Sequence, residues 1–372
     1  MRTLSSFRPS SGTHVVVRVD FNVPLKGGVI VDDRRIKNAF PTIDLLLKKK
    51  TVPILVAHLE DGTKSLRPIA RFLSRSYRVD FITGDIFDVH TTGRIAATRP
   101  GRVVLLENIR RYEGEKKNDP KFAKQLASLG DAYVDEAFSV AHRAHASIVG
   151  VPKLLPHYAG LAFAKEVKAL TFTLRRPFFF ILGGAKFETK VPLIEKFLKM
   201  ADHVFIAGAI ANSFFKASGF PVGKSVVDDG QDKSIKKFAN NAKLLLPIDV
   251  VVVHGKKSRT CTLEEVKKDD IIVDIGPKTV ALVIEKVKKA KLIVWNGPTG
   301  WYEKGFTGAT KKIARAIESS KAHAIIGGGD TGAVIEKTLR KHSKHIFIST
   351  AGGAAIDFLA KGTLPGIEAL ND

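Results

Sequence analysis

Residues 15–21 read VVVRVDF, an apolar, β-branched run without the alternation that a half-exposed strand shows. Such a continuous run is typical of a strand buried on both faces of a parallel sheet. Comparable runs occupy residues 52–58, 79–83, 103–107 and 132–138. The intervening segments RIKNAFPTIDLLLKKK and DPKFAKQLASLG have helical spacing, and Gly130 marks the end of the second. This order predicts a doubly wound α/β fold for the first half of the chain.

The same alternation starts again in the second half. Strands are expected at residues 178–182, 203–206, 250–254, 291–295, 322–326 and 345–349. Segments such as KVPLIEKFLKMA and TKKIARAIESSKA supply helices between them, and the amphipathic GLAFAKEVKALTFTLRR, which ends before Pro177, predicts a helix between the halves. We therefore expect two doubly wound, Rossmann-like parallel-sheet domains, residues 1–156 and 175–349, joined by an interdomain helix at 157–174 and separated by a hinge cleft.

Composition limits the class of protein. With 372 residues, 44% of them hydrophobic, the chain is too long for one core and has enough apolar material for two. Its single cysteine, Cys261, excludes a disulfide or a cysteine-based metal site within one chain. The start of the sequence lacks the apolar core of a signal peptide, and no apolar run reaches about 18 residues. We expect a soluble, cytoplasmic protein without a membrane segment.

The formal net charge of +23 raises the question of a nucleic-acid partner, because clustered Lys and Arg neutralise phosphates. The excess is spread over both halves, and no recognition helix or aromatic stacking motif accompanies it. Nucleic acid is therefore expected only as a nonspecific electrostatic partner. Alternatively, the charge steers anionic substrates towards the protein.

Polar residues follow the expected strands of the first half, at the edge where doubly wound sheets bind ligands. They are Asp20, Asn22, Arg34, Arg35, His58, Arg110, His142, Arg143 and His145. Taken singly, each is explained as a surface cation, a helix cap or a structural histidine. Several arginines and a histidine that converge from separate strands instead predict a pocket for a small polyanion.

Three glycine-rich turns, ILGGAKFETK, IIGGGDTGAVIEK and STAGGAAIDFL, lie between an expected strand and a helix in the second half. Free backbone N–H groups and the helix dipole favour phosphate at such turns, although none has the spacing of a P-loop or a dinucleotide fingerprint. Lys186 and Lys190 stand four residues apart, which predicts two ammonium groups on one helical face near a phosphate. Asp330 is either a helix N-cap or a carboxylate for nucleotide-bound Mg²⁺.

Eight segments, taken together, carry a family resemblance. They read RVDFNVPL, ENIRRYEGE, DAYVDEAFSVAHRAHAS, ILGGAKFETKVPLI, VDIGPKT, VWNGPTGWYEKGF, IIGGGDTGAVIEK and STAGGAAIDFLAKGTLPGIEAL. In this order, over essentially the whole chain, they resemble the signature blocks of phosphoglycerate kinases. The resemblance implies reversible, Mg²⁺-dependent phosphoryl transfer between 1,3-bisphosphoglycerate and ADP, giving 3-phosphoglycerate and ATP in glycolysis.

The resemblance also assigns roles to residues, with phosphoglycerate in the first domain and nucleotide in the second. The implied substrate-binding residues are Asp20, Asn22, Arg35, His58, Arg110 and Arg143. The implied nucleotide-binding residues are Lys186, Lys190, Asn296, Glu303, Gly327, Gly328, Gly329, Asp330 and Thr331. Arg35, Lys190 and Gly329 would be catalytic, and Asp330 would bind the metal. Residues 350–372 would form a C-terminal tail that returns to the first domain.

The sequence departs from the family pattern at two places. Glu60 and Asp61 stand where a Gly and an anion-binding Arg are usual, which weakens substrate binding unless Arg67 compensates. Ala207 and Ala209 replace glycines at the expected adenine pocket, which leaves the base preference open.

Two other functions are compatible with parts of the sequence. A binding protein of the same fold that has lost catalysis is favoured by Glu60 but disfavoured by the retained Arg35, Lys186, Lys190 and Asp330. Nucleic-acid association, as the sole function or an extra one, would show as a steep salt dependence of retention. A monomer is expected, because a hinged two-domain enzyme gains no evident advantage from dimer contacts.

Overall fold

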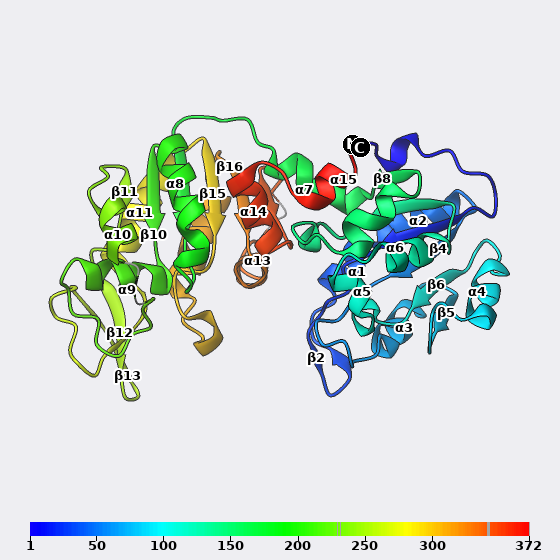
Figure 1. Cartoon of the computed structure of the whole chain (residues 1–372). Helices are drawn as coiled ribbons and strands as arrows, with labels where there is room; N and C mark the ends of the chain where they lie inside the picture. Colours follow the sequence, from blue (N-terminus) through cyan, green and yellow to red (C-terminus); the bar gives the residue numbers. More distant parts are fainter. Residues whose placement is uncertain (229, 231, 341–342, 372) are drawn as a thin grey trace. The chain divides into compact units, whose positions relative to one another are not determined.

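The protein is described by a computed structural model that covers residues 1–228, 230, 232–340 and 343–371. The chain divides into two compact units, Met1–Lys168 with Lys361–Asp372 and Ala169–Ala360, and each unit has its own six-stranded sheet (Figure 1). Within those ranges, no helix is both long enough and apolar enough to cross a membrane.

The first sheet is entirely parallel, with the strand order β5-β6-β4-β1-β7-β8. Its strands are β1 (His14–Arg18), β4 (Val52–Val56), β5 (Val79–Ile82), β6 (Val103–Leu106), β7 (Ala132–Asp135) and β8 (His157–Ala159). Val15, Val16 and Val17 of β1 are fully buried, which explains why the run that opens the fold shows no alternation. The prediction of a doubly wound parallel sheet is confirmed here.

The first unit also contains helices, short helical turns and a two-stranded hairpin. They are α1 (Arg34–Asn38), α2 (Phe40–Lys48), α3 (Arg67–Leu73), α4 (Val89–Ala96), α5 (Glu113–Lys116), α6 (Pro120–Ala127) and α7 (Leu161–Leu170), with η1 (Leu4–Ser6), η2 (Ile109–Arg111), η3 (Phe138–Val140), η4 (Ala146–Gly150), η5 (Val151–Lys153) and the pair β2 (Leu25–Lys26) and β3 (Val29–Ile30). The single helix expected at residues 35–50 is divided at Ala39. Pro41 lacks an N–H and is tolerated only in a first turn, so a new helix begins immediately before it.

The second sheet is also entirely parallel, with the order β11-β10-β9-β15-β16-β17. Its strands are β9 (Phe178–Leu182), β10 (His203–Ile206), β11 (Leu244–Leu245), β15 (Leu292–Asn296), β16 (His323–Gly327) and β17 (Ile346–Ile348). Its helical segments are η6 (Glu188–Lys190), α8 (Val191–Met200), α9 (Gly208–Ala217), α10 (Asp232–Ala239), α11 (Pro277–Lys289), η7 (Tyr302–Lys304), α12 (Gly308–Glu318), α13 (Gly329–Glu336) and α14 (Gly353–Lys361). All five residues of β9 are buried, as its continuous apolar run predicts.

The strand expected at residues 250–254 exists, but its predicted place in the parallel sheet is wrong. β12 (Val250–His254) lies between β13 (Lys257–Cys261) and β14 (Ile271–Ile275) in a separate antiparallel sheet. His254 pairs with Lys257, so only two residues connect the strands, and Gly255 has the positive φ of 59° that such hairpin turns favour. This glycine was the signal for a hairpin instead of a crossover helix.

The division between the units falls within α7, which ends at Leu170, earlier than the helix expected up to residue 174. Residues 361–372 belong to the first unit, where α15 (Pro365–Ala369) packs against η4 and Gly366 N donates to Ala141 O at 2.8 Å. The domain boundaries and the hinge cleft inferred from the sequence remain predictions.

Two loops of the second unit cross so closely that only glycine fits. A Cβ atom on Gly183, after β9, would lie 2.0 Å from the carbonyl oxygen of Pro298, after β15. A Cβ atom on Gly297 would lie 2.2 Å from the carbonyl oxygen of Gly183. The carboxyl ends of β9 and β15 are therefore held in backbone contact, which brings the residues that follow these strands together.

We predict that Gly183→Ala lowers the free energy of unfolding of the second unit by about 2 kcal/mol, because backbone atoms must move to admit the methyl group. Gly308→Ala is the matched control, since Gly308 starts α12 with nothing within 4 Å of a Cβ atom. Thermal unfolding followed by circular dichroism measures both. Equal melting temperatures for the two variants would contradict the crossing of these loops.

Candidate active site

The carboxyl ends of four strands gather basic side chains in the first unit. Arg18 ends β1, His58 follows β4, Arg110 lies in η2 after β6, and Arg143 follows η3 after β7. Parallel strands place all these positions at one edge of the sheet, the edge at which doubly wound folds bind ligands. The predicted anion pocket thus has its residues together within one unit.

His58 is held in one tautomer by Arg18. A guanidinium can only donate, so the contact of 3.1 Å from Arg18 Nη2 makes His58 Nδ1 an acceptor. Complete burial, followed by the charges of neighbouring arginines, lowers the pKa of His58 well below its ordinary value. The ring is therefore neutral with its proton on Nε2, and Nε2 has no partner within the described part of the chain. A buried N–H that lacks a partner is a ready donor for an anion.

Arg110 presents the same combination of burial and unpaired donors. Its side chain is buried, and neither Nε nor Nη2 has a hydrogen-bond partner among the described residues. Burial, and then the charges of Arg18 and Arg143, lower the pKa of its guanidinium, which nevertheless remains charged at neutral pH. An unpaired buried cation is costly unless a ligand anion binds to it.

His145 and Glu60 lie beside the cationic cluster that Arg18, Arg110 and Arg143 form. Burial and the charges of Arg110 and Arg143 lower the pKa of His145 to about 4, so this imidazole is neutral at pH 7. Glu60 lies within the cluster, with its Oε2 3.6 Å from Nη1 of Arg143, and its side chain is 62% exposed. The protein therefore carries a carboxylate of its own beside the anion pocket.

The expected compensation by Arg67 is not found. Its guanidinium lies over the ring of Phe81, 5.7 Å from the centroid. Asp61 is engaged locally instead, because it accepts hydrogen bonds from Thr63 and lies 3.6 Å from Lys64 Nζ.

Arg35 and Asp20 form a second polar group at the end of β1. Arg35 Nη1 lies 3.2 Å from Asp20 Oδ2, and it also donates to the main-chain oxygen of Asn22 at 3.3 Å. Asn22 Oδ1 accepts from the backbone N–H of Glu60 at 3.1 Å, which connects this group to the loop after β4. The neighbouring Arg34 is bound instead to Asp32, through Nε and Nη2.

The second unit gathers unpaired donors after β15 and β16. Lys190 Nζ donates to Asn296 Oδ1 at 3.0 Å, which leaves Asn296 Nδ2 buried and without a partner in the described ranges. Thr331 Oγ1, in the first turn of α13, is likewise buried and unpaired there. Burial lowers the pKa of Lys190 to about 8. An amine, an amide N–H and a hydroxyl at a helix N-terminus suit the oxygens of a phosphate.

The predicted common helical face for Lys186 and Lys190 is wrong. Lys186 lies in the loop before η6 and is exposed, whereas Lys190 ends η6 and is half-buried. The glycines after β9 keep this loop out of helical conformation, since Gly184 has a φ of 107°.

The turn after β16 has the predicted strand–glycine–helix order, with Gly327 in β16 and Gly328 as N-cap of α13 at a φ of 105°. Because Gly328 is the N-cap, that role does not fall to Asp330. The side chain of Asp330 lies outside the described residues.

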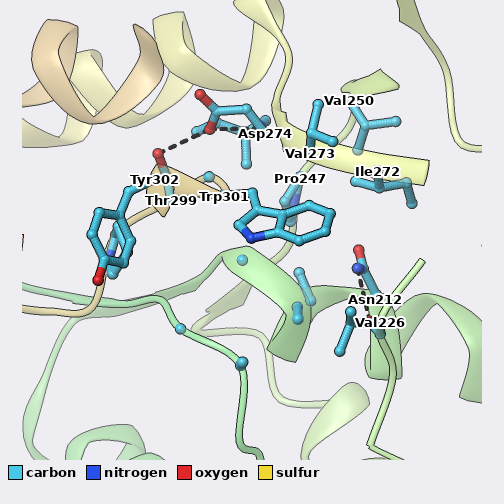
Figure 2. A pocket seen from close by; sticks show the side chains of 18 of the residues that line it. Asn212, Val226, Pro247, Val250, Ile272, Val273, Asp274, Thr299, Trp301 and Tyr302 are labelled. Atoms are coloured by element: carbon cyan, nitrogen blue, oxygen red, sulfur yellow. Dashed lines mark hydrogen bonds between the residues drawn. The ribbon is translucent and has the colours of Figure 1, made fainter. Parts of the chain in front are cut away.

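The same unit contains a pocket of about 310 Å³ between α9, β12, β14 and the loop after β15 (Figure 2). Its walls are mostly apolar and include Phe215, Val250, Ile272 and Trp301. Glu303, expected near a ribose, lines its rim and is exposed.

Sequence reasoning did not select every residue of these sites. Arg18 interrupts the buried valine run of β1, and a charge in such a run was a usable signal. Asn212 and Trp301 line the pocket but carried no pattern of their own.

One parallel sheet carries unpaired donors at its edge, and the other unit has further unpaired donors and an apolar pocket. This combination is that of a phosphotransferase. The phosphoglycerate kinase family model matches residues 7–362. The chain belongs to the phosphoglycerate kinase family.

Individual relatives agree over nearly the full length. The chain is 44% identical to the phosphoglycerate kinase of Dictyoglomus turgidum and 41% identical to that of Pelotomaculum thermopropionicum, with 97% of this chain covered in both cases and 96% and 97% of the relatives. The structure of the Coxiella burnetii phosphoglycerate kinase matches with a TM-score of 0.84 at 35% identity, covering 99% of this chain and 98% of that one. The Pyrococcus horikoshii enzyme gives 0.89 at 30%, covering 100% and 98%.

The activity follows from the family. The protein is a phosphotransferase with a carboxyl group as acceptor, which moves a phosphoryl group between 1,3-bisphosphoglycerate and ADP in glycolysis. Enzymes of this family use a divalent metal together with the nucleotide. In the described part of this chain, no group of three or more His, Cys, Asp or Glu residues could hold a metal ion.

We predict that the low pKa of Lys190 leaves a signature in stability. Its pKa is about 8 in the folded state and near 10.5 when unfolded, so between these values the unfolded chain holds more protons. Raising the pH through this window therefore stabilises the protein relative to a Lys190→Met variant by up to about 3 kcal/mol.

Denaturant unfolding at pH 7, 8, 9 and 10 tests this dependence. Lys199→Met, which removes an exposed amine from α8, the helix that follows Lys190, is the control and should show no comparable pH dependence relative to the parent. A constant difference between the parent and the Lys190→Met protein across this range would contradict the burial of the charged amine.

Proposed function

We propose that the first unit binds 3-phosphoglycerate through the residues collected at the carboxyl ends of its strands. His58 Nε2, Arg110 and Arg143 hold the phosphate-bearing anion, and the support for this is the set of buried donors that lack protein partners. Asp20 and Asn22 bind the glycerate hydroxyl and carboxylate end, while Arg35 contacts the transferring phosphoryl group.

The second unit, in this proposal, binds the nucleotide. Lys190 stabilises the transferred group, and Asn296 Nδ2 and Thr331 Oγ1 donate to phosphate oxygens, as their lack of protein partners supports. Lys186, Gly327, Gly328 and Gly329 complete the phosphate site. Glu303 binds the ribose from the rim of the pocket.

The ion that accompanies the nucleotide is proposed to be Mg²⁺, carried as part of the substrate. The neighbouring Lys190 amine and Asn296 Nδ2 are donors suited to phosphate oxygens and not to a cation, so they leave the metal to the phosphates. Asp330 supplies the protein carboxylate for it. Mg²⁺ commonly binds through substrate phosphates and one or two carboxylates.

Phosphoryl transfer requires that the protein position the two substrates and place positive charge around the transferring group. The nucleophile is the carboxylate of 3-phosphoglycerate, ionised at neutral pH, so no general base is needed. Phosphoryl transfer develops charge on the equatorial oxygens, which Arg35 from one unit and Lys190 from the other neutralise. Transfer requires the two substrates to meet, so hinge closure, which also excludes water, is part of the proposal.

Location and partners are also part of this proposal. The glycolytic role of the relatives supports a cytoplasmic enzyme, and Cys261, a buried free cysteine, is consistent with a reducing compartment. We propose that the protein is a monomer. Nucleic acid, in this proposal, binds only as a nonspecific electrostatic partner of a chain with net charge +23.

Arg35→Ala and Lys190→Ala each lower kcat at least about 100-fold if these two cations act on the transferring group. A coupled assay that follows ADP formation from 3-phosphoglycerate and MgATP measures this. The matched control is Arg34→Ala, because Arg34 is the adjacent arginine but is bound to Asp32. A kcat within threefold of the parent for either test variant would refute its assigned role, and an inactive parent that still binds ADP would point to a binding protein.

Glu60 lies close to Arg143 and competes with the substrate anion. Glu60→Gln should therefore lower KM for 3-phosphoglycerate about fivefold, with kcat little changed, since one exposed charge acts across solvent. Asp61→Asn is the control, because this neighbouring carboxylate pairs with Lys64 and not with the arginines. Equal KM values for the two variants would remove Glu60 from the anion site.

A further inference from the structure

The pocket contains a buried acceptor that the protein itself does not use. Asn212, on α9, is 3% exposed and lines the pocket. Its Nδ2 donates to the main-chain oxygen of Val226 at 3.0 Å, which fixes the orientation of the carboxamide. Oδ1 is then left without a hydrogen-bond partner anywhere in the described ranges. Reversing the amide would sacrifice the bond to Val226, so the acceptor stays available.

The other buried carboxyl or amide group of the pocket is already satisfied. Asp274 accepts from Thr299 Oγ1 at 3.0 Å and from the backbone N–H groups of Ile275 and Ala309. Asn212 therefore differs from Asp274 in having an oxygen left over for a ligand.

The surroundings of Asn212 fit a flat, apolar ligand. Val250, Ile272 and Phe215 line the pocket, and the indole of Trp301, 36% exposed, adds a planar face. Figure 2 shows the carboxamide nitrogen of Asn212 directed to Val226 and its oxygen on the side of Ile272. A planar heterocycle in this pocket would lie against apolar walls and meet one acceptor.

We propose that Asn212 Oδ1 accepts a hydrogen bond from the exocyclic amino group of a 6-aminopurine, which makes Asn212 a specificity-determining residue for the base. This inference rests on the proposed nucleotide role of the pocket. A 6-oxopurine presents a carbonyl oxygen at that position, so two acceptors would face each other and both would be unpaired. A site built around a hydrogen bond rejects the analogue that cannot form it.

The test compares two nucleotides that differ in the group at C6 of the base. Isothermal titration calorimetry of the whole protein, without phosphoglycerate, gives Kd for ADP and for inosine diphosphate. ADP should bind about tenfold more tightly, as the loss of one hydrogen bond implies. Asn212→Leu, similar in size but without an acceptor, should reduce this ratio to about one, mainly by weakening ADP.

Two further variants distinguish loss of the acceptor from damage to the fold. Asn212→Ser is polar but shorter, so its hydroxyl does not reach the position of Asn212 Oδ1. This variant should reduce the ratio of the two dissociation constants in the same way. Ser213→Ala is the matched control: Ser213 is the buried neighbour on α9, it accepts from the N–H of Asp228 at 2.9 Å, and it does not line the pocket. Its ratio should stay near tenfold.

The possible failures are distinguishable. Equal affinity of the parent for the two nucleotides, or an unchanged ratio in Asn212→Ser, would overturn the role of Asn212 while leaving nucleotide binding intact. Failure of the parent to bind either nucleotide at millimolar concentration would overturn the nucleotide site itself, and with it this inference.

Discussion

Burial of both faces of each parallel sheet confines polar chemistry to the edge where the strands end. Val15, Val16 and Val17 of β1 are fully buried, and all five residues of β9 are buried as well. No water or charge can be accommodated along such strands at low cost. The first positions at which a polar side chain can reach a ligand are therefore the last residue of each strand and those that follow it, and both sites are built there.

The first site is kept ready for an anion by a buried network. Arg18 Nε donates to Ser147 Oγ at 2.8 Å, and Ser147 Oγ in turn donates to Glu115 Oε1 at 2.7 Å. This buried carboxylate, linked to Arg18 through Ser147, offsets the charge of the guanidinium. Arg18 is thus satisfied within the protein, while Nε2 of His58, which it orients, and the unpaired donors of Arg110 are left for a ligand. The cost of leaving them unpaired is the driving force for binding.

Sequence alone predicts the fold well where one physical signal acts without competition. The continuous valine and phenylalanine runs of β1 and β9 predict their strands because those strands are buried on both faces. β12 looks similar in sequence, yet Gly255 turns it into a hairpin, so its sheet could not be inferred from hydrophobicity alone. The strand-end residues such as His58 are predictable because position along a strand determines the edge. Asn212 is not, because its importance lies in which of its two amide atoms is bonded to Val226.

The central claim is that unpaired donors at the ends of the two sheets form two separate ligand sites. Hydrogen–deuterium exchange of the whole protein, with 3-phosphoglycerate alone and then with ADP alone, tests it most directly. We predict that 3-phosphoglycerate slows exchange at residues 18–22, 107–111 and 141–147, and that ADP slows it at residues 183–190, 207–212 and 296–303. Protection of the same segments by both ligands, or protection by 3-phosphoglycerate outside the loops that follow β1, β4, β6 and β7, would contradict the account.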